Sequence, residues 1–271
     1  MKVAFQGERG AYSEEAVALL FHDVDLLPCR TLREVFEATA AGSVDSGVVP
    51  VENSQAGSIN ETYDLLLRYD LFITGEVDVR VQHCLLGLPG ETLESIKKVF
   101  SHPQALAQCE EFLRRLGAEM IPTYDTAGSA KMVAHEKLSG CAAVASRRAA
   151  MLYGLQVLAS GIETNPDNYT KFLAIGREPA PYTPVSKTSL VFATRNVPGA
   201  LYRALGVFAT REINLTKLES RPSRRRPWEY IFYLDFEGHL QDSACREALE
   251  ELKKYTTFLK ILGSYPKVPS P

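Results

Sequence analysis

Short apolar segments alternate with amphipathic helical patterns through roughly the first 175 residues of the chain. The apolar segments, which are typical of buried strands, are KVAFQG, SGVVPVE, LFITGEVDVRVQHCLLGL, KKVFSH, CAAVAS and FLAIG. Between them, a helical spacing of apolar residues covers 13–21, 32–41, 59–68, 104–116, 129–135 and 147–153. This alternation predicts an α/β layered structure.

The apolar stretch 71–88 is too long for one strand, because an average strand has about five or six residues. It could carry the backbone from one sheet into another. We therefore expect two α/β lobes with a cleft between them, one formed by 1–75 with 165–178 and the other by 76–164.

A proline-containing segment, REPAPYTPVSK, follows this region and holds Pro179, Pro181 and Pro184. Such a segment can continue neither a helix nor a central strand, so it predicts a semi-rigid linker. Beyond it the order is strand (KTSLVFAT), helix (199–210), strand (INLTKLES), strand (WEYIFYLDFEG), helix (242–255) and strand (FLKILGSYP). This βαββαβ order predicts a ferredoxin-like second module over 187–266.

Composition narrows the classes of function. Of 271 residues, 45% are hydrophobic and 23% charged, and the net charge is only -3. The one dense basic stretch, 221–226, is short and predicts a solvated loop, so we expect no nucleic-acid partner. The chain should also be neither exported nor membrane-spanning, because MKVAFQG enters a strand directly and no apolar run approaches ~20 residues.

The five cysteines are odd in number, widely spaced and mostly within apolar runs. They predict reduced, buried thiols and a cytoplasmic protein. They are Cys29, Cys84, Cys109, Cys141 and Cys245. With no CxxC pair, and no HxxxH or HExxH spacing among the five histidines, no metal site is predicted.

Four polar clusters stand at the ends of predicted strands, where an open α/β sheet presents its ligand groups. They are GERGAYS (7–13), VPVENSQAGSIN (49–60), SHPQALAQC (101–109) and NPDNYTKF (165–172). In the second cluster an apolar run ends abruptly in Glu52, Asn53 and Ser54. These residues could deliver hydrogen-bonding groups to a cleft, or they could simply form a turn that caps the next helix.

The first and third clusters resemble helix starts. Ser101 is the predicted N-cap, with Pro103 in the first turn and Gln108 about two turns along, and capping alone could explain Ser101. Gly7 and Gly10 could open a helix N-terminus onto an anion. Their segment is not the GxGxxG fingerprint, however, so a nucleotide cofactor is not expected.

The fourth cluster is the hardest to explain by structure alone. Asn168, Thr170 and Lys171 precede the apolar strand FLAIG, and the last two point to opposite faces if the strand has begun. No Ser/His/Asp or Cys/His nucleophile set is recognisable. Chemistry at these clusters must therefore use hydroxyl, amide and ammonium groups, with one carboxylate at most.

Together with DTAGSA (125–130), PGALYRAL and KLESRP, these clusters resemble the prephenate dehydratases and their arogenate-specific relatives, from residue 2 to about 266. The resemblance implies a two-lobed, periplasmic-binding-protein-like catalytic domain over 1–178 and an ACT regulatory domain over 187–266. It also implies a small-molecule substrate, decarboxylating dehydration of prephenate to phenylpyruvate, and no cofactor. No fused chorismate mutase is expected.

The resemblance also implies site residues. The catalytic set is Thr170, Glu52, Asn53, Ser101 and Gln108. The substrate-binding set is Ser54, Asn168, Lys171 and Phe172. The family usually has Thr-Arg-Phe where this chain has Lys171 in the middle, and an arginine fork grips a carboxylate differently from a lysine ammonium.

In the second module the resemblance implies that L-phenylalanine binds as an effector at an interface between ACT domains. The implied residues are Pro198, Gly199, Ala200, Leu201, Glu219, Ser220, Arg221 and Pro222. A homodimer or homotetramer formed through these domains is expected. Three alternatives stay open: an arogenate dehydratase, a non-enzymatic small-molecule sensor, and a second module that serves only for dimerisation.

Overall fold

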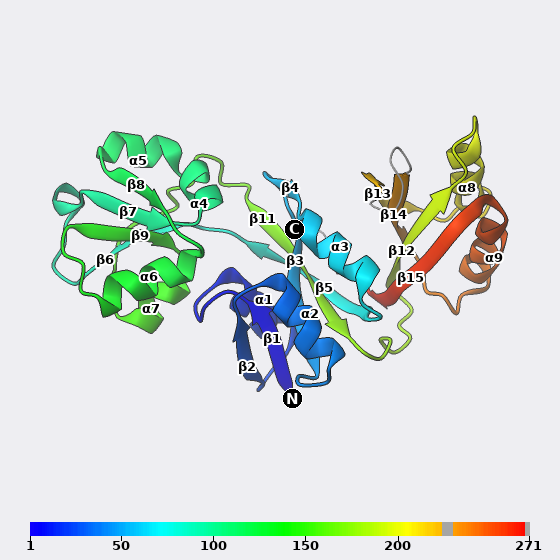
Figure 1. The fold of residues 1–271 in the computed structure, drawn as a ribbon, viewed down its shortest axis with the longest axis horizontal. Coiled ribbons are helices and arrows are strands. Elements are labelled where there is room, and N and C mark those ends of the chain that lie inside the picture. The colour runs from blue at the N-terminus through cyan, green and yellow to red at the C-terminus, as the bar shows by residue number, and fades with distance from the viewer. Residues whose placement is uncertain (224–229, 269–271) are drawn as a thin grey trace. The chain divides into compact units, whose positions relative to one another are not determined.

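A computed structural model of the chain describes residues 1–223 and 230–268. It contains two compact units, the first formed by Met1–Thr62 with Val77–Phe172 and the second by Tyr63–Glu76 with Leu173–Pro271. Sheets with helices against them make up the described chain, as Figure 1 shows. The predicted α/β class is confirmed.

The first sheet has the strand order β2-β1-β3-β11-β5, with the short β4 paired to β3. Strands β1, β2 and β3 run parallel, and helices α1 and α2 pack on them. The strands are β1 (Lys2–Gln6), β2 (Asp25–Cys29), β3 (Ser46–Asn53), β4 (Gly57–Ser58), β5 (Phe72–Arg80) and β11 (Tyr169–Gly176). The helices that follow β1, β2 and β4 are α1 (Tyr12–Leu20), α2 (Leu32–Ala40) and α3 (Asn60–Arg68).

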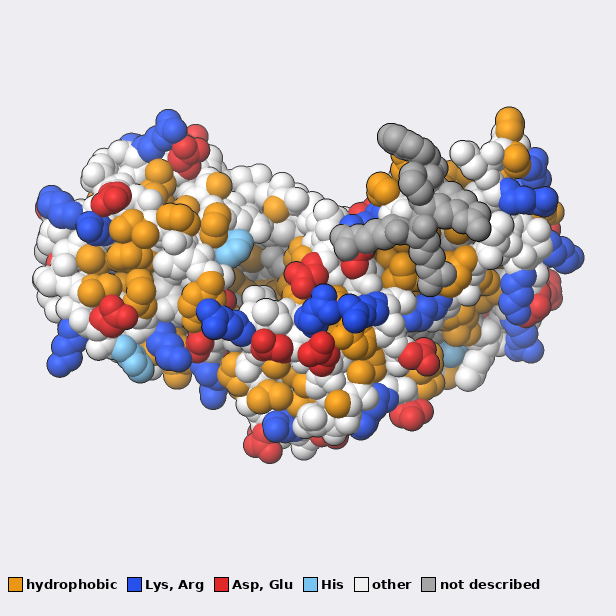
Figure 2. All heavy atoms as spheres, viewed as in Figure 1, with side chains coloured by type: hydrophobic (Ala, Val, Ile, Leu, Met, Phe, Trp, Pro, Cys, Tyr) orange, Lys and Arg blue, Asp and Glu red, His pale blue; other side chains and the backbone are white. Residues whose placement is uncertain are grey.

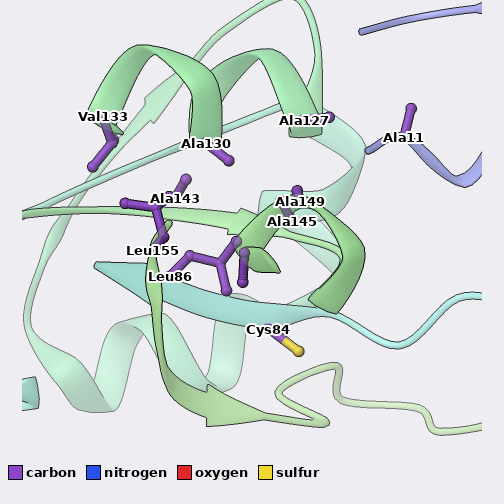
Figure 3. Packing of buried hydrophobic residues seen from close by; sticks show 11 residues of the cluster. Ala11, Cys84, Leu86, Ala127, Ala130, Val133, Ala143, Ala145, Ala149 and Leu155 are labelled. Carbon is purple, nitrogen blue, oxygen red and sulfur yellow. The ribbon is translucent and has the colours of Figure 1, made fainter. Parts of the chain in front are cut away.

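The second sheet has the order β10-β6-β9-β7-β8. Its strands are β6 (Cys84–Gly87), β7 (Lys98–Ser101), β8 (Glu119–Pro122), β9 (Cys141–Ala145) and β10 (Gln156–Ser160). Its helices are η1 (Leu93–Ser95), α4 (Pro103–Gln108), α5 (Glu110–Leu116), α6 (Thr126–His135) and α7 (Arg147–Tyr153). Figure 3 shows how small side chains of α6 and α7, such as Ala130 and Ala149, let these helices lie close to Leu86 and Ala143 on the sheet.

The predicted crossing between sheets is confirmed, since β5 belongs to the first sheet and β6 to the second. The crossing lies later than expected, because β5 continues through Arg80. The predicted helix over 104–116 is two helices that meet at Cys109. Strands β2, β8 and β10 were not predicted from the sequence. Each is short, and its residues are less apolar than those of the central strands.

The third sheet confirms the βαββαβ order, with antiparallel strands arranged β13-β14-β12-β15. Its elements are β12 (Ser186–Thr194), α8 (Ala200–Ala209), β13 (Leu215–Pro222), β14 (Tyr230–Glu237), α9 (Ser243–Leu252), η2 (Lys253–Tyr255) and β15 (Thr256–Pro266). Helices α8 and α9 cover one face, where Phe208 and Leu249 pack on Phe192 and Phe236. Trp228 and Glu229, predicted to begin a strand, lie outside the described residues.

The other face of the third sheet packs against α3 and β5 within the second unit. The Lys260 ammonium donates to the carbonyl oxygens of Leu66 at 3.1 Å and Tyr69 at 2.6 Å, near the end of α3. The Tyr233 hydroxyl donates to the carbonyl oxygen of Tyr63 at 2.9 Å. Backbone carbonyls at a helix end lack partners within the helix, so these bonds satisfy groups that would otherwise need water.

The basic stretch 221–226 was predicted to be a solvated loop, and for its first residue this is wrong. Arg221 lies in β13, its side chain is only 13% exposed, and its guanidinium is 3.8 Å from Asp64 and over the Tyr63 ring. Arg224, Arg225 and Arg226 lie outside the described residues.

Basic and acidic residues are nearly balanced in number, at 30 and 33. On the face drawn in Figure 2, basic and acidic side chains are interspersed. All five cysteines are free thiols, and four of them are buried, with Cys141 half-buried. Within 1–223 and 230–268, no helix combines the length and the apolar character needed to cross a bilayer.

Candidate active site

Asn53, the last residue of β3, is the centre of a buried amide network. Its Nδ2 lies 2.9 Å from Thr170 Oγ1, 2.8 Å from Asn168 Oδ1 and 3.1 Å from the carbonyl oxygen of Tyr169. Strands β3 and β11 are neighbours in the first sheet, which is why residues more than a hundred positions apart meet here. The structure thus brings together three of the residues that the sequence singled out.

The opposite end of the Asn53 amide faces donors. Its Oδ1 accepts from the backbone N–H groups of Gln55 at 3.1 Å and Ala56 at 3.0 Å, and from Gln108 Nε2 at 3.4 Å. With donors around the oxygen and acceptors around the nitrogen, only one orientation of the amide satisfies both ends. Thr170 Oγ1 therefore accepts a hydrogen bond from Asn53, and its own hydrogen remains to be donated.

Gln108 joins the network from α4, a helix that packs on the second sheet, and it is the last residue of that helix. Its Oε1 lies 3.0 Å from Asn168 Nδ2 and 2.9 Å from His83 Nε2. The three amides of Asn53, Asn168 and Gln108 thus bond to one another in a closed ring. Because each amide limits the others, the position of Thr170 Oγ1 is set by all three.

Ser101 is not the N-cap that the sequence predicted. It is the last residue of β7, whereas His102 caps α4 by accepting from the Gln104 N–H at 3.3 Å. The Ser101 hydroxyl is fully buried and donates to the carbonyl oxygen of Val144 at 2.6 Å. Its hydrogen is therefore engaged with β9, and its catalytic role stays a prediction.

Ser54 ties the end of β3 to the start of β11. Its hydroxyl donates to the Asp167 carbonyl oxygen at 3.1 Å and accepts from the Tyr169 N–H at 3.0 Å, and its own N–H bonds to the Tyr169 carbonyl oxygen. These contacts fix the backbone beside Thr170. In this arrangement Ser54 acts on the strand ends, and substrate binding by it is untested.

Glu52, Lys171 and Phe172 stand beside the residues of this network along β3 and β11. Glu52 precedes Asn53 on β3, so the two side chains leave opposite faces of that strand. The Lys171 ammonium lies 2.9 Å from the Asp78 carboxylate on β5. Phe172 packs in the core with Val3 and Phe5 and supports β11 from inside.

His83 is a site residue that the sequence analysis missed. It is 2% exposed, burial lowers its pKa, and its Nε2 contacts Gln108. In the sequence it stands in the apolar run VQHCLLGL, which was interpreted only as a strand. The signal that could have found it is a histidine inside a run whose other side chains are apolar, a thiol or a neutral amide.

The GERGAYS segment contacts the second sheet's helices. The Gly10 N–H donates to the Glu14 carboxylate at 2.5 Å, so a side chain of α1 itself takes the place predicted for an anion. Burial alone would raise the pKa of Glu14, but this bond and the Arg148 guanidinium lower it. Gly10 has φ +87°, and a Cβ there would meet the Ala149 backbone at 2.9 Å, so glycine is required on both grounds.

The predicted effector residues lie in two places in the second unit. Pro198 and Gly199 precede α8, with Gly199 as its N-cap at φ +75°, and Ala200 and Leu201 form its first turn. Residues 219–222 end β13. Glu219 and Tyr233 are paired across β13 and β14, which places Glu219 on the sheet face that bears α3, opposite the face that α8 covers.

Metal-binding residues do not gather anywhere in the described ranges. No group of three or more His, Cys, Asp or Glu side chains is placed there as a metal site would need. The network around Asn53 consists of amides, a hydroxyl and a neutral imidazole.

Comparison with known proteins gives consistent matches along the chain. A family model described as prephenate dehydratase matches residues 3–180, and an ACT domain model matches residues 188–254. The Arabidopsis thaliana protein named arogenate dehydratase/prephenate dehydratase 2, chloroplastic, is 48% identical over an alignment of 277 positions that covers 98% of this chain and 73% of that protein.

Two solved structures extend the match to the fold. A prephenate dehydratase from Arthrobacter aurescens in complex with L-Phe has a TM-score of 0.88 and 31% identity, over 98% of this chain and 90% of that one. A protein described as GqqA, a novel type of quorum quenching acylase, has a TM-score of 0.90 and 38% identity, over 99% of both chains. The predicted two-part architecture with a terminal ACT domain is confirmed.

Proposed function

The chain belongs to the prephenate dehydratase family, and we propose that it converts prephenate to phenylpyruvate, water and CO2. The observation that carries this proposal is the hydroxyl of Thr170, which accepts from Asn53 and keeps its hydrogen for donation. In the reaction the ring carboxylate leaves as CO2, its bonding electrons enter the ring, and the hydroxyl at C4 departs. Aromatisation drives the step, so no redox cofactor is needed.

The task left to the protein is to orient the substrate and help the hydroxyl leave. A threonine hydroxyl is a weak acid, so Thr170 acts as a hydrogen-bond donor to the departing oxygen, and solvent supplies the proton that completes the water molecule. Asn53 and Gln108 hold this donor. Glu52 and Lys171 are neighbours of Asn53 and Thr170 along β3 and β11, but their side chains leave the opposite faces of these strands, so substrate orientation by these two charges rests on the family pattern alone. A positioned donor of this kind typically accelerates the reaction roughly 10²- to 10⁴-fold.

Arogenate, in which an amine replaces the keto group of prephenate, is the alternative substrate. The Arabidopsis relative is named for both activities. Steady-state kinetics of the purified protein with prephenate and arogenate side by side tests the proposal: we expect the higher kcat/KM with prephenate. A higher value with arogenate would assign the chain to the alternative, and no turnover of either would remove the dehydratase function.

An acylase activity like the one for which GqqA is described fits this site less well. Acyl transfer by a hydroxyl needs an adjacent base that removes its proton. The contact found at Thr170 Oγ1 is the amide nitrogen of Asn53, which donates and cannot take a proton. A purely binding role as a sensor is less well supported, because the relatives are named as dehydratases.

Phenylalanine is the proposed effector, bound by residues 198–201 and 219–222 at an interface between two copies of the second module. The packing of α3 on the third sheet supports coupling, because Arg221 contacts Asp64 and Tyr63, and Lys217 lies over the Tyr63 ring at 5.1 Å. Along the chain, α3 directly follows the β3–β4 hairpin that carries Asn53. An effector that shifts Arg221 would therefore act on the helix that begins next to the catalytic strand.

Calorimetry tests the effector site. We expect phenylalanine to bind the wild-type protein, and Glu219→Ala to weaken binding about 10-fold or more, which is about 1.4 kcal/mol, because the carboxylate is the proposed partner of the ligand's ammonium group. Glu250→Ala, which removes an exposed carboxylate from α9, is the matched control and should bind as wild type. Linkage requires a substrate analogue to weaken phenylalanine binding by the factor by which phenylalanine weakens the analogue.

A wild-type protein that binds no phenylalanine, or binds it equally with and without the analogue, contradicts the regulatory proposal and leaves the catalytic proposal standing.

The oligomer is proposed to be a dimer or tetramer formed through the third sheet, where pairing would cover exposed strand edges. Sedimentation velocity measures the number of chains in the oligomer directly.

Four buried free thiols support a reducing compartment such as the cytoplasm.

A further inference from the structure

His83 contacts the amide network from a buried position. The residue follows β5 on the segment that leads to β6, it is 2% exposed, and its Nε2 lies 2.9 Å from Gln108 Oε1. Its role in the proposed reaction must therefore be exerted through Gln108.

The backbone of His83 is held at both of its polar groups. Its N–H donates to the Glu163 carboxylate at 2.9 Å, and its carbonyl oxygen accepts from the N–H groups of Gly161 at 2.9 Å and Ile162 at 3.2 Å. The ring also packs edge-on against Tyr12, with centroids 5.7 Å apart. These contacts hold the imidazole in place, so a bond from the ring can fix the orientation of the Gln108 side chain.

The surrounding bonds decide which ring nitrogen carries the proton. Gln108 Oε1 already accepts from Asn168 Nδ2, and Gln108 Nε2 faces the Asn53 oxygen. If the Gln108 amide turned over, its oxygen would face the Asn53 oxygen and its nitrogen would face the Asn168 nitrogen. His83 must therefore donate from Nε2 to Gln108.

At the other side of the ring, Nδ1 lies 3.3 Å from the Tyr12 hydroxyl, whose single hydrogen is shared between Nδ1 and the Gln82 carbonyl oxygen at 2.7 Å. Burial disfavours a charged imidazole, which leaves the neutral ring with its hydrogen on Nε2. Each bond from His83 through Gln108 and Asn53 to Thr170 then runs in one direction.

We propose that His83 is a positioning residue whose Nε2–H sets the orientation of Gln108 and, through Asn53, directs the hydroxyl hydrogen of Thr170 toward the substrate. This inference rests on the proposed dehydratase function. If His83 acts in this way, removing its donor should impair turnover much more than substrate binding.

Two variants at this position separate a donor from a space-filling role. In His83→Gln the side-chain amide nitrogen occupies about the place of Nε2 and can donate to Gln108, whereas His83→Leu fills space without a donor. We expect His83→Leu to lower kcat by about 10-fold or more with a smaller change in KM, and His83→Gln to recover most of that loss. Equal kcat losses in the two variants would overturn the inference.

A double-mutant cycle shows whether the effect passes through Gln108. In a Gln108→Ala background, His83→Leu should cause no further loss of kcat, because the link is already broken. Losses that multiply in the double variant would mean that His83 acts on general stability instead. Thr39→Val, which removes a buried hydroxyl bonded to Val35 in α2, is the control for a change in the first unit away from the network.

Nitrogen NMR of the ring gives a readout that does not depend on activity. In the wild-type protein at neutral pH the His83 signals, assigned by their loss in His83→Gln, should be those of a neutral ring protonated at Nε2. A ring protonated at Nδ1 alone would contradict the inference even in an active enzyme. If the wild-type protein instead turns over neither prephenate nor arogenate, the proposed function fails while the tautomer is still decided.

Discussion

Replacing Thr170 with alanine is expected to lower kcat with prephenate by roughly 10²- to 10⁴-fold, the range typical of a positioned proton-transferring or donating group. The physical reason is that Asn53 Nδ2 donates to Thr170 Oγ1, which leaves the hydroxyl hydrogen directed away from the network. Loss of that donor removes an interaction made with the departing oxygen in the transition state. Steady-state kinetics therefore should show kcat reduced more than KM is raised.

Thr170→Ser is the matched control for this result. It keeps the donor and should retain more activity than alanine, while Thr170→Val keeps the shape of the side chain and should resemble alanine. A folded Thr170→Ala protein with full activity would remove Thr170 from the mechanism. Circular dichroism of all three variants should match wild type, because Thr170 is only half-buried at the start of β11.

Replacing Lys187 with methionine is expected to destabilise the second unit by about 3–5 kcal/mol, because removing one member of a buried ion pair leaves a charge uncompensated. Lys187 on β12 contacts the carboxylates of Glu76 on β5 and Asp235 on β14, and the Lys187 and Glu76 side chains are 8% and 3% exposed. Urea denaturation followed by circular dichroism measures the change. Lys267→Met removes a half-exposed pair with Glu237 and should cost less than about 1 kcal/mol.

The loss in Lys187→Met should shrink as the pH is lowered from neutral toward the ordinary pKa of an aspartate. Burial raises the pKa of Asp235, and Lys187 opposes that rise, so the variant carries a carboxyl group with a higher pKa still. A folded-state pKa above the unfolded value means that the folded state binds more protons, and stability then increases as the pH falls toward the unfolded pKa. A destabilisation that is independent of pH would show that the carboxylates are not its cause.

Strong hydrophobic patterns predicted most of this fold. The buried strands β1, β3, β9 and β12 and helix α7 were predicted within a residue or two, since each strand contains a short apolar run and α7 lies between clear strand and turn signals. Strands β2 and β8 lie at sheet edges, and their residues are mostly exposed or half-buried. An edge strand buries little, so its sequence carries little of the signal that a central strand does.

The site was only partly predictable. Polar clusters at strand ends indicated Asn53, Gln108, Asn168 and Thr170, which the structure joins by hydrogen bonds. Ser101 was misplaced because a serine before a proline is also typical of a helix cap, and its bond to Val144 depends on strand pairing that the sequence does not specify. His83 was missed because its partner Gln108 comes from another part of the fold.

We propose that a hydroxyl held by amides, without a metal or redox cofactor, promotes the loss of CO2 and water from prephenate. The most direct measurement follows both products from prephenate with the purified protein, with and without EDTA, against an enzyme-free blank. We expect phenylpyruvate and CO2 in equal amounts, at rates unchanged by the chelator. Product formation abolished by EDTA and restored by a divalent ion, or CO2 released without phenylpyruvate, would contradict it.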